Sequence, residues 1–122
     1  EELGGLGEVE HALLPAFAAR YRFLFSPIRY TSMGLSVIEA MMAGVPVVAL
    51  ATTEMATVVE HEITGFACTD LEHLIGWMRI LVRDLELARE VGEAGRRCAA
   101  ERFSIERFSR DWDAAFRLVT GA

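Results

Sequence analysis

Glu39 is the residue whose surroundings most clearly suggest chemistry. It stands in "GLSVIEA", one turn into an expected helix that begins near Gly34, after a polar loop that starts at Ser26. Unpaired amides at the start of a helix attract phosphate, and a glycine there lets a ligand approach the backbone. A carboxylate beside those amides could accept two hydrogen bonds from a vicinal diol, as acids do for ribose in dinucleotide sites. The pattern therefore favours a nucleotide ligand.

A purely structural interpretation of the same residues stays open. Ser36 and Glu39 match the S-x-x-E capping box, in which Ser36 would be the N-cap and both side chains would satisfy amides of their own helix. Glu39 would then have no role toward a ligand. The spacing alone is compatible with both interpretations.

The elements around this loop predict an α/β fold. Buried strands are expected at about residues 21–25, 45–50 and 65–69, with helical segments at 34–43 and 55–59 between them. The second strand is β-branched and apolar on both faces, which is typical of parallel strands covered on both sides. Alternating strands and helices favour a Rossmann-like parallel sheet, in which ligands bind beyond the carboxyl ends of the strands. The Glu39 loop follows the first strand and so lies at that edge.

Helices are expected on either side of this core. Residues 8–20 have a helical pattern in which Pro15 forces a kink or a fresh start. Residues 70–119 read as three amphipathic helices, whose predicted N-caps are Asp70, Asp84 and Ser104. Three strands are few for an independent sheet of this class. This predicts that strands are missing upstream or that a partner covers the sheet edge.

Composition excludes several classes of function. The 122 residues suffice for one domain, and 52% of them are hydrophobic, which favours a substantial core. The net charge is −6 and the basic residues form no stripe, so nucleic acid is not expected as a partner. The longest apolar run, Ala40–Ala51, is too short to span a bilayer, and no secretory signal is visible. The cysteines and histidines lack metal-ligand spacing, so no metal is expected.

A family resemblance extends from about Leu13 to the end of the chain. The stretches "SPIRYTSMGLSVIEAMMAGVPVVA" and "VVEHEITGF" resemble the C-terminal half of a GT-B glycosyltransferase of the retaining family 4, or group 1, type. That family typically has S-x-x-E-G-F-G-L-x-x-x-E-A-M-A-x-G-x-P-V-V-A, followed by V-V-E-x-G-x-x-G. The resemblance implies that residues 1–122 are a partial C-terminal nucleotide-sugar-binding domain, with a Rossmann-like sheet that is the incomplete half of a GT-B fold.

The resemblance also implies roles for individual residues. Glu39 corresponds to the second acid of the family's E-x7-E pair, which holds the ribose hydroxyls of the nucleotide. The turn into the helix corresponds to the segment whose amides face the donor sugar and its diphosphate. The implied donor-binding residues are Thr31, Met33, Gly34, Leu35, Ser36 and Glu39.

Two positions depart from the family pattern. Thr31 stands where the family has the first acid of the pair, and Thr57 stands where a later loop carries its acid, with Glu54 nearby but out of register. In the family the first acid contacts hydroxyls of the transferred sugar. A threonine hydroxyl could still bond a sugar, more weakly than a carboxylate by ~1 kcal/mol. Nucleotide binding is therefore the clearer expectation, and the identity of the transferred sugar stays open.

The expected activity is that of a retaining glycosyltransferase that uses a nucleotide-sugar donor and needs neither a metal nor another cofactor. Its expected partners are the donor and a missing N-terminal domain, with homo-oligomerisation left open. We expect a cytoplasmic location, with peripheral membrane attachment an option for the full-length protein, and no activity for these residues alone. The alternative is a non-catalytic Rossmann-like interaction module, or a degenerate transferase that lacks the first acid.

Overall fold

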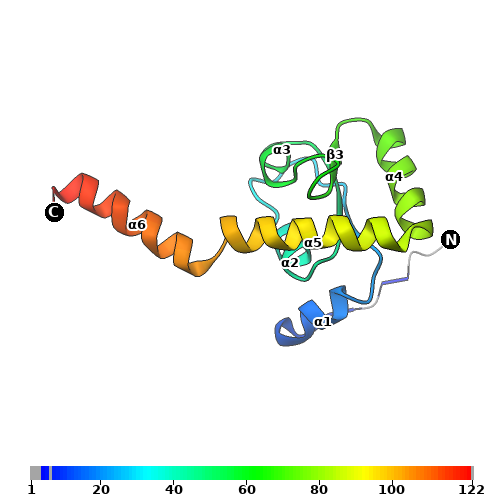
Figure 1. The fold of residues 1–122 in the computed structure, drawn as a ribbon, viewed down its shortest axis with the longest axis horizontal. Coiled ribbons are helices and arrows are strands. Elements are labelled where there is room, and N and C mark those ends of the chain that lie inside the picture. Colours follow the sequence, from blue (N-terminus) through cyan, green and yellow to red (C-terminus); the bar gives the residue numbers. More distant parts are fainter. Residues whose placement is uncertain (1–3, 6, 122) are drawn as a thin grey trace.

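A parallel sheet of three strands forms the centre of the protein. The computed structural model describes residues 4–5 and 7–121, and Figure 1 shows how the elements are arranged. The strands are β1 (Leu24–Ser26), β2 (Val47–Leu50) and β3 (Phe66–Cys68), paired in the order β1-β2-β3. β1 begins later than its expected range of 21–25, because pairing starts where the Leu24 amide donates to the Pro46 carbonyl.

The middle strand is apolar on both faces because helices cover both. All four residues of β2 are buried. Side chains alternate along a strand, so Val47 and Ala49 enter one hydrophobic cluster, and Val48 and Leu50 enter the other. The continuous apolar run in the sequence therefore reflects a sheet with two buried faces.

Different helices cover the two faces. On the Val47 face lie α2 (Leu35–Met42), α3 (Met55–Val58) and the last third of α5 (Leu85–Arg102). The Val48 face packs against α4 (Leu71–Arg83) and the first part of α5, so α5 contributes to both clusters. The fully buried helical side chains include Val37 and Met41 on the first face and Leu74 and Leu81 on the second.

Helix α5 packs closely on the turn that ends α2. Gly44 in this turn has a φ of +73°, the left-handed conformation that glycine tolerates best. A Cβ atom built on Gly92 would lie 2.1 Å from the Gly44 carbonyl oxygen, and one built on Gly95 would lie 2.9 Å from the Thr64 carbonyl oxygen. Glycines at both positions let the helix backbone approach the loops that precede β2 and β3.

The last three helices begin at the predicted caps. Asp70 accepts hydrogen bonds from the amides of Glu72 and His73, Asp84 accepts from Leu87, and Ser104 accepts from Arg107. The three predicted N-caps are therefore confirmed. The first two helices pack their apolar stripes into the core, and the third does not.

Helix α6 (Ile105–Thr120) projects away from the rest of the chain (Figure 1). No residue of α6 is buried, and its aromatic stripe is half exposed, with Trp112 at 51%. Phe108, Trp112 and Phe116 contact one another along one face, with ring centroids 6.0 and 5.5 Å apart. This stripe covers no surface of the described chain.

The N-terminal segment forms shorter helices than the sequence suggested. Instead of one helix over residues 8–20, the structure has a 3-10 turn, η1 (His11–Leu13), followed by α1 (Leu14–Ala18). Pro15 lies in the first turn of α1, where its missing N–H costs nothing. The fresh start at Pro15 is therefore confirmed, and the predicted extent of the helix was wrong.

Candidate functional site

The candidate site lies at the carboxyl end of β1, where residues 27–34 lead into α2. Gly34 is the N-cap of α2, with an extended backbone at φ −81° and ψ 105°, and no side chain caps the helix. The Gly34 carbonyl accepts from the Val37 amide at 3.0 Å, which closes the first turn. The amides that precede Val37 at the start of α2 therefore have no side-chain partner among the described residues and could donate hydrogen bonds to an anionic ligand.

The capping-box interpretation of Ser36 and Glu39 is wrong. Because the extended residue is Gly34, helical geometry already begins at Leu35, and Ser36 lies inside the first turn. A serine at that position cannot serve as the N-cap, and Glu39 lies too far along the helix to complete the box. Ser36 and Glu39 line the same cavity instead, one turn apart on the same face of α2.

Glu39 is available to a ligand. Its side chain is 41% exposed, and its Oε1 atom lies 3.5 Å from Nε2 of His11. His11 is itself 90% exposed, so this contact contributes little to stability. No other hydrogen bond or ion pair involves the Glu39 carboxylate within the described residues. The carboxylate thus retains acceptor capacity near the uncapped helix start.

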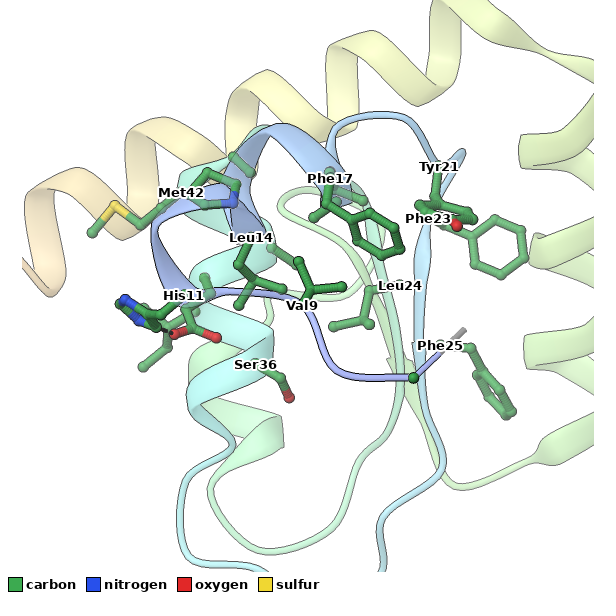
Figure 2. Close-up of a pocket in the computed structure, with 18 residues that line it drawn as sticks. Val9, His11, Leu14, Phe17, Tyr21, Phe23, Leu24, Phe25, Ser36 and Met42 are labelled. Carbon is green, nitrogen blue, oxygen red and sulfur yellow. Dashed lines mark ion pairs between the residues drawn. The ribbon is translucent and has the colours of Figure 1, made fainter. Parts of the chain in front are cut away.

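An apolar cavity of about 770 Å³ adjoins Glu39. Figure 2 shows Leu14 and Phe17 of α1, Leu24 of β1 and Val9 around this space. The polar side chains that reach its wall include those of His11, Ser36 and Glu39. An apolar hollow with a few convergent polar groups is typical of a ligand site. It is equally typical of the open edge of a sheet, because in the described part of the chain β1 pairs on one side alone.

The remaining predicted site residues lie along the loop with different exposures. Thr31 and Gly34 are half-buried, whereas Met33 and Leu35 are exposed, Leu35 at 72%. Backbone conformation does not require the glycine at 34, and a Cβ there would make only ordinary contacts, 3.5 Å from Val37. Of the predicted site residues, Ser36 and Glu39 line the cavity, whereas Thr31, Met33, Gly34 and Leu35 do not.

Three residues near the site were missed by the sequence analysis. His11 faces Glu39 from a segment 28 positions away, a contact for which the sequence contains no signal. Thr52 and Thr53 follow β2 and donate hydrogen bonds to carbonyl oxygens of residues 28 and 31 in the β1–α2 loop. Two threonines directly after a buried strand are a recognisable signal, because adjacent parallel strands bring their following loops to the same edge.

Neither a metal-binding cluster nor a membrane-spanning helix occurs in the described ranges, 4–5 and 7–121. No group of three or more His, Cys, Asp or Glu side chains there is placed to hold a metal ion. None of the helices in these ranges has the length and hydropathy needed to cross a bilayer. Cys68 and Cys98 are free and half-buried.

The parallel sheet with helices on both faces, and a loop open at its carboxyl edge, define a Rossmann-like domain. Its structural neighbours are GT-B glycosyltransferases. The chain belongs to the glycosyl transferases group 1 family, whose model matches residues 5–84. It is 30% identical over 87 residues to N-acetyl-alpha-D-glucosaminyl L-malate synthase of Bacillus anthracis. That alignment covers 70% of this chain and 23% of the relative.

Solved structures show the same fold. Sucrose-phosphate synthase from Thermosynechococcus elongatus matches 95% of this chain with a TM-score of 0.85 and 26% identity. HepE of Anabaena, in a structure with UDP-glucose, matches 84% with a TM-score of 0.76 and 21% identity. The chain spans 30% and 29% of those two proteins, respectively. It thus corresponds to less than a third of each relative's length.

Proposed function

We propose that this chain is the donor-binding portion of a retaining glycosyltransferase that takes a sugar from a nucleotide-sugar. The observation that carries the proposal is the uncapped start of α2 with Glu39 one turn later on the cavity face. The group 1 family supports a glycosyltransferase, and the HepE structures contain UDP-glucose and UDP. Together these findings favour a nucleoside diphosphate as the part of the donor that α2 binds.

Each part of the donor would meet a different group. The amides at Gly34, Leu35 and Ser36, at the positive end of the helix dipole, would hold the diphosphate. Glu39 would accept hydrogen bonds from the two ribose hydroxyls, which fixes the orientation of the nucleotide. Thr31, with Met33 beside it, would face the transferred sugar.

Catalysis would rest on charge stabilisation. Negative charge develops on the diphosphate as the sugar leaves, and preorganised amides that already point at the phosphates stabilise that charge in the transition state. We propose that the acceptor attacks the face from which the diphosphate departs, so that the anomeric configuration is retained, and that no metal or other cofactor takes part. Glu39 would then supply affinity and orientation and would not transfer a proton.

The rest of the transferase would cover the apolar surfaces that this chain leaves exposed. Because the chain spans less than a third of each relative, we propose that an upstream α/β domain packs on the aromatic stripe of α6. The open edge of β1 is the surface through which two copies could instead pair. The cytoplasmic location expected from the sequence stays a prediction.

Calorimetric titration of the 122-residue chain with UDP, GDP and ADP tests the proposal. Glu39→Ala should weaken the binding of the preferred nucleotide about tenfold, because it removes hydrogen bonds to a charged acceptor worth ~1.5 kcal/mol or more. Glu90→Ala, which removes an exposed carboxylate from α5, is the matched control and should bind like wild type. Equal heats for wild type and Glu39→Ala would count against the ribose role.

The alternative of a non-catalytic interaction module makes the opposite prediction. It derives support from α6, where Trp112 and its aromatic neighbours are exposed in the described chain. A module of that kind would bind none of the three nucleotides. Its stability would also be indifferent to Glu39, because this carboxylate caps nothing.

A further inference from the structure

The β1–α2 loop, residues 27–33, makes few hydrogen bonds. No backbone–backbone hydrogen bond outside the helices and strands involves residues 27–33 in the described chain. Pro27, Ile28, Arg29 and Tyr30 are all exposed, Tyr30 at 93%. A segment with exposed side chains and no backbone bonds would be expected to move freely. Yet this segment sets the position of Gly34, where α2 begins.

Two threonine hydroxyls on the neighbouring loop bind this segment. The Oγ1 atom of Thr52 donates to the Ile28 carbonyl at 3.0 Å, and the Oγ1 atom of Thr53 donates to the Thr31 carbonyl. These are the side-chain hydrogen bonds made to residues 27–33 within the described chain. They join the loop after β1 to the loop after β2 at two points, three residues apart.

The backbone of the second loop is arranged to present both hydroxyls. The Thr52 amide donates to the Leu50 carbonyl at 2.8 Å, and the Thr52 carbonyl accepts from the Met55 amide at 3.0 Å, which defines a tight turn. Thr53 within it has a φ of +49°, a left-handed conformation that is unusual for a β-branched residue. Such outliers persist where the surroundings hold them and are concentrated at functional sites.

The same turn also lies next to the start of α2. Met55, the first residue of α3, is buried, and its Cε atom would lie 3.8 Å from a Cβ built on Gly34. The segment Thr52–Met55 therefore hydrogen-bonds the β1–α2 loop at Ile28 and Thr31 and lies beside Gly34, the residue that follows this loop. Any movement of this turn would be transmitted to the helix start.

We propose that Thr52 and Thr53 are positioning residues, which clasp the β1–α2 loop and hold the first amides of α2 ready for the donor. This inference rests on the proposed function. If the loop were free, only a fraction of molecules would present the amides correctly, and the apparent dissociation constant would rise by the inverse of that fraction. Neither threonine needs to touch the nucleotide for this effect.

Two measurements on the 122-residue chain test the clasp. Thr53→Val keeps the β-branched shape and removes the hydroxyl, and Thr52→Val does the same at the other contact. Backbone 15N order parameters for residues 28–33 should fall from about 0.85 to below about 0.6 in both variants. UDP binding should weaken about 2- to 12-fold, the range expected for loss of one neutral hydrogen bond. Thr53→Ser, which restores the hydroxyl, should recover both values.

A matched control separates the clasp from a general effect of losing a threonine hydroxyl. Thr120→Val removes a similar bond, from Oγ1 to the Phe116 carbonyl in α6, and should change neither measurement. The proposal is overturned if residues 28–33 stay as ordered in Thr53→Val as in wild type. It is also overturned if their order falls while UDP affinity is unchanged. A wild-type chain that binds no UDP, GDP or ADP would refute the proposed function, and the order parameters alone would then decide the clasp.

Discussion

Replacing Gly92 by alanine tests the packing of α5 against the turn that ends α2. A Cβ at this position would lie 2.1 Å from the Gly44 carbonyl oxygen, 3.0 Å from the Gly44 carbonyl carbon and 3.3 Å from the Pro46 ring. Real Cβ atoms essentially never come closer than 3.0 Å to such a neighbour, so helix and turn must separate by about 0.9 Å (3.0 − 2.1). The atom in the way belongs to the backbone, which cannot rotate aside.

The size of the effect follows from two opposing terms. Alanine gains about 1 kcal/mol over glycine in a helix interior. Overpacking of a close contact costs about 1–3 kcal/mol. Gly76→Ala in α4 isolates the first term, because nothing lies within 4 Å of a Cβ built there. The two variants should therefore differ in free energy of unfolding by about 1–3 kcal/mol, with Gly76→Ala the more stable.

Urea denaturation followed by far-UV circular dichroism gives the comparison directly. Gly76→Ala should raise the midpoint, Gly92→Ala should fall below Gly76→Ala, and both should keep the wild-type m-value. Gly95→Ala should lie between them, since its Cβ would be 2.9 Å from the Thr64 carbonyl oxygen. If Gly92→Ala stabilises the chain as much as Gly76→Ala, α5 does not contact the Gly44 turn and the packing described above is wrong.

Two further predictions concern helix starts and a surface ion pair. Asp70→Ala should lower the free energy of unfolding by about 1 kcal/mol, because it removes the N-cap of α4. Ser36→Ala should change it by less than about 0.5 kcal/mol, because Ser36 caps no helix. Equal losses in urea denaturation would contradict the geometry of α2. The hydrogen bond from Arg96 lowers the pKa of Glu93. The pair therefore stabilises the folded state at pH values above the usual pKa of a glutamate, and this stabilisation is lost as the pH falls through the lowered pKa. Carbon-detected NMR titration should show the Glu93 midpoint rising in Arg96→Gln, and an unchanged midpoint would disprove the pairing.

Local signals in the sequence were sufficient to predict most of the fold. The apolar run around Val47 and Val48 indicated a strand buried on both faces, and the two clusters show why. Asp70 and Asp84 marked helix starts because an acid at the N-cap satisfies amides within two or three residues, which is a local interaction. The Rossmann-like class followed from the order of these elements.

Two kinds of feature were not predictable in the same way: the choice between competing local signals, and contacts between distant segments. The S-x-x-E pattern at Ser36 suggested a cap, but the chain enters the helix at Gly34, two residues earlier. The contact between His11 and Glu39 and the clasp between Thr53 and Thr31 join segments that only the folded sheet brings together. Periodicity also indicated that α6 has an apolar face without indicating whether this chain covers it.

The N-terminal caps of the longer helices support the candidate site independently of the sequence motif around Glu39. Among residues 4–5 and 7–121 there are four helices with eight or more residues, of which α4, α5 and α6 have a side-chain cap and α2 has none. α4 also begins at the carboxyl edge of the sheet, directly after β3, yet Asp70 occupies its amides. An acid there would repel a diphosphate, whereas the α2 start presents free amides and no acid before Glu39. Glycine in place of a capping side chain costs α2 only roughly a few tenths of a kcal/mol, and it leaves the helix start after β1 as the one among these four that is open to an anion.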